Sequence, residues 1–183
     1  MKKKLLLHSC CGPCSTTAIT RLAQEYDVTV YYYNPNIYPQ DEFIKRQETQ
    51  KEFLRKHSSD ITLIEGEWEN DLYEECIDGL RDCKEGGARC EKCFILRLEK
   101  TASLAKSLNC DLFATTLTVS PHKNAKLINE IGAKLSEKIG VEYLPSDFKK
   151  QDGYLQSIKM SKEYNLYRQN YCGCKYSIWW EEK

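Results

Sequence analysis

Short apolar runs alternate with longer amphipathic segments along most of the chain. The apolar runs predict β-strands at residues 3–9, 28–34, 61–66, 111–119 and 141–148. Apolar positions at helical spacing predict helices at residues 13–26, 40–57, 90–108, 123–139 and 153–166, and residues 68–86 predict a helix that passes into a loop. Strands separated by helices are typical of α/β proteins. We therefore predict a Rossmann-like parallel sheet of about five strands with flanking helices and a helical and loop C-terminal tail.

The composition excludes some classes of protein. A chain of 183 residues without a linker predicts one domain over residues 1–183. No apolar run approaches the length of a membrane span, and the three leucines after the first lysines are too few for a signal peptide. We therefore expect a soluble, cytoplasmic protein with no membrane partner. The formal charge is zero, but the C-terminal third is net basic, which permits a basic patch there.

Ten cysteines are the outstanding feature of the composition. In a reducing cytosol, closely spaced cysteines bind metal or perform redox chemistry more often than they form structural disulfides. Most of them fall into three short motifs, HSCCGPCS, RCEKCF and YCGCKY.

The first two motifs together offer four thiolates to one centre. Cys10 and Cys11 follow the first predicted strand, where Gly12 provides freedom for a sharp turn. Cys90 and Cys93 begin a predicted helix, whose N-terminus favours thiolates. Four cysteines suit either a tetrahedral zinc or an iron–sulfur cluster, and the spacing alone leaves both open.

In such sheets, ligands collect beyond the carboxyl ends of the strands, where the strand order reverses. The first and fourth predicted strands should end side by side at this point. We therefore expect Cys10 and Cys11 to share a site with residues 115–120. This position favours a catalytic cluster over a zinc staple. Cys14, one helical turn further on, is expected to be an inert helix residue, with a spare ligand as the alternative.

The third motif places Cys172 and Cys174 one residue apart. A disulfide across so small a loop would stabilise the fold little and would be easily reduced, which suits an electron relay or a switch. We predict a redox pair. Two further metal ligands or two free thiols are the alternatives.

Several ordered motifs, HSCCGPCS, RCEKCFILRLEKTA, TTLTVSPHKN, SDFKK and LYRQNYCGCKYS, resemble those of the QueH-type epoxyqueuosine reductase family over residues 4–178. The resemblance implies an oxidoreductase of queuosine biosynthesis with an adenine-nucleotide-hydrolase-like sheet. Its substrate would be the anticodon stem-loop of a tRNA, where it would reduce the epoxide of epoxyqueuosine at the wobble position. ATP use is not indicated, because HSCCGPCS stands where nucleotide-binding relatives have a glycine-rich phosphate loop.

The resemblance also implies a 4Fe–4S cluster with an additional iron ion beside it. The implied cluster and metal ligands are Cys10, Cys11, Cys90 and Cys93. The implied redox-active pair is Cys172 and Cys174. We hypothesise that cluster thiolates and a carboxylate hold the second iron, with Asp147 as the candidate carboxylate. A helix cap or a partner for Lys149 is the alternative role of Asp147.

Other candidate side chains lie outside the cysteine motifs. His122 follows the fourth predicted strand and could donate a proton to the leaving oxygen. Lys149, Lys150 and Arg168 could bind tRNA phosphates. Tyr33 could stack on a splayed base. A structural histidine, a solvated basic face and a core tyrosine are the respective alternatives.

Two other functions stay open from the residues alone. One is a zinc-stapled RNA-binding module without catalysis, and the other is an ATP-dependent tRNA sulfur-transfer enzyme. The missing glycine-rich loop counts against the second. The sequence does not identify the electron donor.

Overall fold

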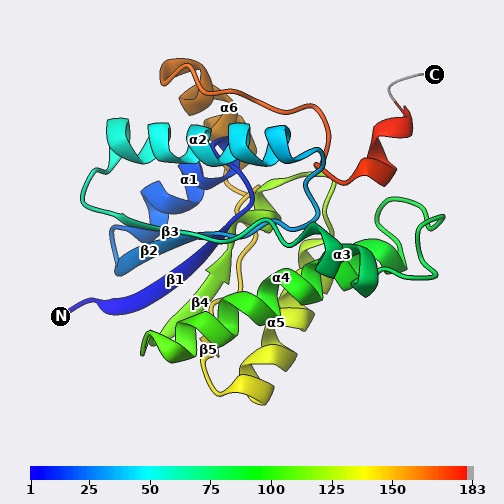
Figure 1. The fold of residues 1–183 in the computed structure, drawn as a ribbon. Helices are drawn as coiled ribbons and strands as arrows, with labels where there is room; N and C mark the ends of the chain where they lie inside the picture. The colour runs from blue at the N-terminus through cyan, green and yellow to red at the C-terminus, as the bar shows by residue number, and fades with distance from the viewer. Residues whose placement is uncertain (181–183) are drawn as a thin grey trace.

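A parallel sheet lies at the centre of the computed structural model, which describes residues 1–180 (Figure 1). Within these residues the strand order is β3-β2-β1-β4-β5, and every neighbouring pair is parallel. The strands are β1 (Lys3–Ser9), β2 (Tyr26–Tyr32), β3 (Thr62–Glu65), β4 (Leu112–Thr115) and β5 (Glu142–Tyr143). The predicted Rossmann-like sheet is confirmed. The prediction of one domain over residues 1–183 extends past the described residues and stays a prediction.

Helices cover both faces of this sheet. They are α1 (Gly12–Leu22), α2 (Gln40–His57), α3 (Asn70–Cys76), α4 (Ala88–Ser107), α5 (Ala125–Ile139) and α6 (Gly153–Glu163), with the 3₁₀ helices η1 (Thr116–Val119) and η2 (Lys175–Trp180). α1, α2 and α6 lie on one face and α4 and α5 on the other, with α3 beside α4 (Figure 1). In the described part of the chain, no helix combines the length and the apolarity that crossing a membrane requires.

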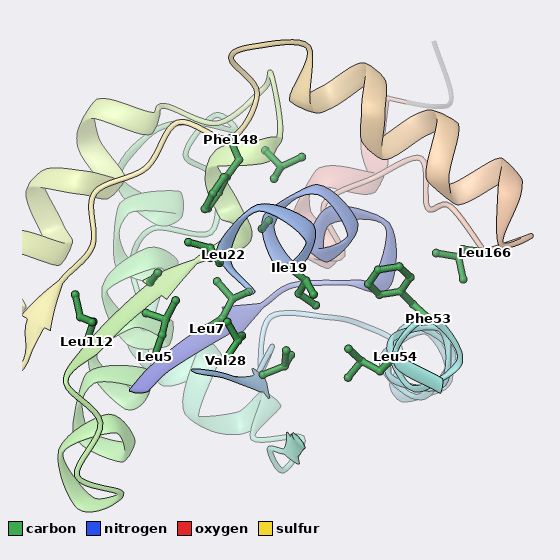
Figure 2. Packing of buried hydrophobic residues seen from close by; sticks show 14 residues of the cluster. Leu5, Leu7, Ile19, Leu22, Val28, Phe53, Leu54, Leu112, Phe148 and Leu166 are labelled. Atoms are coloured by element: carbon green, nitrogen blue, oxygen red, sulfur yellow. The ribbon is translucent and has the colours of Figure 1, made fainter. Parts of the chain in front are cut away.

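Each face of the sheet has its own apolar core. Leu5 and Leu7 of β1 point toward α1, whereas Leu6 points toward α4 and α5, as the two-residue period of a strand requires. Figure 2 shows the first core, in which Ile19 of α1 and Phe53 of α2 pack over the strands. The consecutive leucines of β1 are therefore explained by burial on both faces of the sheet.

The fourth and fifth strands are shorter than the sequence predicts. β4 ends at Thr115 rather than at residue 119, because the Thr115 hydroxyl accepts a hydrogen bond from the Leu117 amide at 3.1 Å and so begins η1. β5 covers only residues 142–143, since Pro145 has no amide hydrogen to continue the ladder. The remaining predicted elements differ from the structure by a few residues at their ends.

Truncating a leucine of the central strand should destabilise the protein strongly. Leu7→Ala removes a fully buried side chain from the first core, which should lower the free energy of unfolding by about 2–5 kcal/mol. Leu155→Ala, the same substitution at a side chain that is 61% exposed, should change it by less than about 0.5 kcal/mol. Urea unfolding of both variants measures the difference, and equal effects would contradict the buried position of β1.

Candidate functional site

The site lies at the carboxyl edge of the sheet, where the strand order reverses. The chain passes from β1 to β2 and β3, then returns to β4 on the other side of β1. Ligands of parallel α/β sheets bind at such a point. The Cys10 amide, just past β1, donates a hydrogen bond to Thr116 Oγ1, just past β4, at 3.2 Å. This contact confirms the prediction that the residues after these two strands share a site.

The first thiol group consists of Cys10, Cys11 and Cys14. Cys11 caps α1, and its Sγ accepts a hydrogen bond from the Cys14 amide at 3.3 Å. The three Sγ atoms lie within 4.8 Å of one another, and within residues 1–180 no other set of three His, Cys, Asp or Glu ligand atoms lies so close together. The group could hold a metal ion. Cys14, predicted to be an inert helix residue, therefore belongs to the group.

Gly12 allows α2 to pack against the start of α1. A Cβ atom at this position would lie 2.9 Å from the Thr49 carbonyl oxygen and 2.9 Å from Thr49 Cγ2. The backbone of Gly12 is not in the left-handed region. Close approach, rather than the turning freedom predicted from the sequence, is therefore what requires glycine.

The thiols of the first group differ in acidity. Hydrogen bonds from Cys11 and Cys14 hold the pKa of Cys10 well below its usual value. Burial is the main cause that raises the pKa of Cys11 to about 12. Hydrogen bonding to Cys10 is the main cause that raises the pKa of Cys14. With no metal bound, the group thus carries its negative charge on Cys10, with the Lys123 ammonium nearby.

The second thiol group consists of Cys90, Cys93, Cys172 and Cys174, which line a small cavity of about 40 Å³. Cys90 and Cys93 lie at the start of α4, as predicted, and the Gly86 amide donates a hydrogen bond to Cys90 Sγ at 3.2 Å. Burial raises the pKa of both thiols, that of Cys93 to about 11. Such a cavity holds small species only, and thiolates favour soft metals and iron–sulfur clusters.

A tight turn of the C-terminal tail presents Cys172 and Cys174. The tail runs from α6 past the start of α2 to η2, which lies near α3 (Figure 1). Gly173 has a φ of 106°, which favours glycine. The Ser177 hydroxyl lies 3.0 Å from the Cys172 sulfur, and the Tyr73 hydroxyl lies 3.0 Å from the Cys174 sulfur.

The two thiols of this turn are unequal. Hydrogen bonding with Cys174 is the main cause that holds the pKa of Cys172 well below its usual value. The same contact, together with burial, raises the pKa of Cys174. The pair therefore combines a thiolate with a protonated thiol, and a thiolate is the species that attacks in thiol–disulfide exchange.

Arg46 of α2 anchors the turn. Its side chain is 2% exposed and pairs with Glu42 at 2.6 Å. Its guanidinium also donates hydrogen bonds to the carbonyl oxygens of Cys172 at 3.1 Å and of Tyr171 at 3.2 Å. A planar guanidinium can satisfy all of these acceptors at once, which an ammonium cannot do in the same geometry.

A larger cavity of about 580 Å³ adjoins the small one and connects the two thiol groups. Cys10 and Cys14 line it from the first group, and Cys172 lines it from the second. The residues that line both cavities are Glu85, Arg97, His122, Lys123 and Cys172. A volume of several hundred cubic ångströms is typical of ligand pockets.

Two of the predicted residues outside the cysteine motifs line these cavities. His122 lines both. Arg168 lines the larger one, and its Nη1 donates a hydrogen bond to Ser161 Oγ at 3.1 Å. The structure therefore brings these two residues together with the thiols.

The remaining predicted residues lie elsewhere. Asp147 pairs with Lys149 at 2.7 Å and with Lys150 at 3.6 Å, and none of the three lines either cavity. This geometry fits the alternative role of Asp147, that of a partner for Lys149. Tyr33 is 1% exposed and its ring stacks on Tyr31 with centroids 5.5 Å apart, so the alternative of a core tyrosine describes its position.

The sequence does not indicate several polar residues of the site, Glu85, Arg97 and Gln169 among them. Glu85 and Arg97 line both cavities, and Gln169 Nε2 donates a hydrogen bond to Cys11 Sγ at 2.9 Å. Arg97 does carry a signal, because it follows Cys93 by one helical turn within an apolar stripe of α4. Glu85 and Gln169 lie in irregular segments, where no periodic pattern indicates which side chains converge.

The four predicted cluster ligands are divided between the two thiol groups. Within the described residues, the sulfur atoms of these four cysteines do not all lie within 4.8 Å of one another. A single zinc held by these four thiolates therefore does not fit. An iron–sulfur cluster keeps its ligand sulfurs further apart, because iron and sulfide lie between them. Cys10, Cys90 and Cys93 line these adjoining cavities and fit a cluster, whereas Cys11 lines neither cavity and its sulfur lies 3.9 Å from that of Cys10.

The fold and the site together define a class of protein, a Rossmann-like α/β protein with a cysteine-rich site at the switch point of its sheet. A family model described as Epoxyqueuosine reductase QueH matches residues 5–179. The chain belongs to the epoxyqueuosine reductase QueH family. The resemblance inferred from the sequence motifs is thereby confirmed.

Curated relatives carry the same name. Epoxyqueuosine reductase QueH of Streptococcus pyogenes serotype M1 is 43% identical, over 97% of this chain and 71% of its own length. That of Thermotoga maritima is 36% identical, over 95% of this chain and 90% of its own. The fold is similar to that in a crystal structure of a predicted subunit of tRNA methyltransferase from Methanocaldococcus jannaschii, with a TM-score of 0.54. The match covers 85% of this chain and 76% of that chain. Because the two sequences are only 13% identical, the similarity shows the fold alone.

Removing the anchor of the C-terminal turn should loosen it. Arg46→Gln leaves the carboxylate of Glu42, which is 11% exposed, without its cation and should cost about 3–5 kcal/mol of unfolding free energy. Lys51→Gln, a substitution on the same helix, breaks exposed ion pairs. It should lower the free energy of unfolding by less than about 1 kcal/mol. Amide exchange of residues 171–174 should accelerate in the first variant only. Unchanged exchange there would mean that Arg46 does not hold the turn.

Proposed function

We propose that this protein reduces the epoxide of epoxyqueuosine in tRNA to give queuosine, as the name of its family implies. The reaction consumes two electrons and two protons and yields an alkene and water. The observation that carries the proposal is that thiols from three separate segments border two adjoining cavities at the switch point of the sheet. Redox-active sulfur and a ligand pocket therefore share one site.

The larger cavity suits a single nucleoside rather than a folded RNA. An anticodon nucleotide is unpaired and can leave its stack to enter a pocket, as in other enzymes that modify bases. Arg168 and Tyr154 line the cavity and supply a cation and an aromatic ring for such a nucleotide. Lys149 and Lys150 lie outside it and are proposed to contact phosphates of the flanking nucleotides.

The thiols suit the cluster that the family resemblance implies. We assign Cys10, Cys11, Cys90 and Cys93 as ligands of a 4Fe–4S cluster, which supplies electrons one at a time when it is bound. The division of Cys10 from Cys90 and Cys93 between two cavities with common walls supports a group larger than one ion.

An additional iron beside the cluster would take an oxygen ligand as well as sulfur. Glu85 is the carboxylate that lines both cavities, whereas Asp147 is engaged by lysines. We therefore propose Glu85 in place of Asp147 as the carboxylate ligand. Cys14, whose sulfur lies within 4.8 Å of those of Cys10 and Cys11, is the thiol available to the same ion.

The chain's own residues account for the balance of the reaction. Oxidation of the Cys172 thiolate and the Cys174 thiol to a disulfide releases two electrons and one proton, and His122 supplies the second proton that epoxide reduction consumes. A reductant from outside the chain then restores the dithiol. His122 and Lys123 line both cavities, which supports a proton donor to the leaving oxygen and a cation beside its developing negative charge.

The proposed activity is tested on protein purified without oxygen. It should contain iron and sulfide, and with dithionite it should convert epoxyqueuosine in tRNA to queuosine, which nucleoside mass spectrometry detects. A fully loaded cluster without conversion would overturn the activity. Colourless protein with one zinc and no conversion would indicate an RNA-binding module instead, and ATP-dependent thiolation of tRNA would indicate a sulfur-transfer enzyme.

Single cysteine substitutions should separate the cluster ligands from the redox pair. Cys90→Ser should abolish the brown colour and the bound sulfide, because one cluster ligand is lost. Cys172→Ser should keep both and allow one turnover while slowing multiple turnover. Cys110→Ser, at a half-buried thiol that lines neither cavity, is the matched control and should change nothing. Loss of sulfide in the Cys172 variant would make Cys172 a ligand.

A further inference from the structure

Arg97 is a buried cation in the wall that separates the two cavities. It lies on α4 one helical turn after Cys93, and its side chain is 4% exposed. It lines both cavities, which thiols of both groups also line. The neighbouring positions on this face of α4, Phe94 and Leu98, are apolar and buried.

Within residues 1–180, Arg97 has no carboxylate partner within 4.0 Å. Its hydrogen bonds are long. Nε donates to the Cys93 carbonyl oxygen at 3.4 Å, and Nη1 donates to Asn34 Oδ1 at 3.4 Å. Two contacts of this length satisfy little of a guanidinium's capacity for hydrogen bonding.

Two other buried arginines make shorter polar contacts than Arg97 does. Arg46 pairs with Glu42 at 2.6 Å. Arg89, on the same helix as Arg97, donates to two backbone carbonyl oxygens, that of Arg81 at 2.6 Å being one. A buried charge is retained only where an anion or several hydrogen bonds replace its lost hydration. The contrast points to an anion in the cavities.

The groups that surround Arg97 show which anion this is. Cys90 and Cys93 border the smaller cavity together with Arg97, and Cys10 and Cys14 border the larger one. These sulfurs come from both thiol groups. Lys123, the other cation that lines both cavities, makes the site more positive still. A negatively charged group that binds these sulfurs matches both cations.

We propose that Arg97 is a positioning residue that compensates the negative charge of the thiolate-bound cluster and favours the cluster's reduced state. The inference rests on the proposed function. Four thiolates carry more negative charge than the iron–sulfur core carries positive charge, so the bound group is an anion, and reduction adds one further negative charge. A fixed cation in a water-poor site stabilises the more negative of two states.

The test is a redox titration of the loaded protein followed by electron paramagnetic resonance. Arg97→Gln removes the charge and should shift the reduction equilibrium at least tenfold toward the oxidised state, about 59 mV for one electron. Arg97→Lys keeps the charge and should shift it less. Lys100→Gln removes an exposed charge from the same helix, where solvent and Glu69 already screen it, and should leave the midpoint unchanged.

A midpoint unchanged by Arg97→Gln would overturn the inference. If that variant does not fold, Arg97→Met provides the same neutral site. A neutral variant could also fold without binding the cluster. That result supports the inference if the Arg97→Lys variant still binds the cluster. It overturns the inference if the Arg97→Lys variant binds no cluster either. The proposed function fails separately, because the wild-type protein would then assemble no cluster or would form no queuosine.

Discussion

The parallel pairing of β1 with both β2 and β4 determines where the functional groups of this protein lie. His8, at the end of β1, is hydrogen-bonded through Nδ1 to Thr115 Oγ1 at 2.8 Å and through Nε2 to the Tyr33 carbonyl oxygen at 2.9 Å. Burial lowers the pKa of His8 to about 4, so the neutral ring joins the ends of three strands. With these ends held together, the Cys10 amide meets Thr116 Oγ1, and the first thiol group lies at the switch point.

Local charge, rather than the charge of the whole chain, organises the site. The formal net charge is zero, which excludes a strong general attraction to nucleic acid. Within the cavities, sulfur supplies negative charge and Arg97 and Lys123 supply positive charge, with Glu85 and His122 on the same walls. Low dielectric strengthens each of these interactions, so the protonation of the thiols and the ionisation of the cations depend on one another. A group that binds thiolates must fit both the sulfurs and the cations.

The fold was largely predictable from the sequence because periodicity reports burial directly. The leucines of β1 and the stripe that contains Phe94 on α4 are examples. The end of β4 was not predictable, since it depends on a hydroxyl cap by Thr115. The cysteine motifs indicated the chemistry of the site, but tertiary placement decides which other side chains join it. The position of Asp147 at the end of a predicted strand suggests a site residue, but Asp147 pairs with lysines, and Glu85 reaches the cavities from a loop without any pattern.

The start of α1 explains how a Rossmann-like fold can exchange phosphate binding for sulfur chemistry. Phosphates bind at such helix N-termini through free amide groups. In this chain Pro13 has no amide hydrogen, the Cys14 amide donates to Cys11 Sγ at 3.3 Å, and the Ser15 amide donates to the Cys11 carbonyl oxygen at 3.2 Å. The amides of Cys14 and Ser15 are therefore directed at Cys11 rather than at a ligand. Burial raises the pKa of Cys11 to about 12, so this sulfur is a neutral thiol until a metal that binds it replaces the proton.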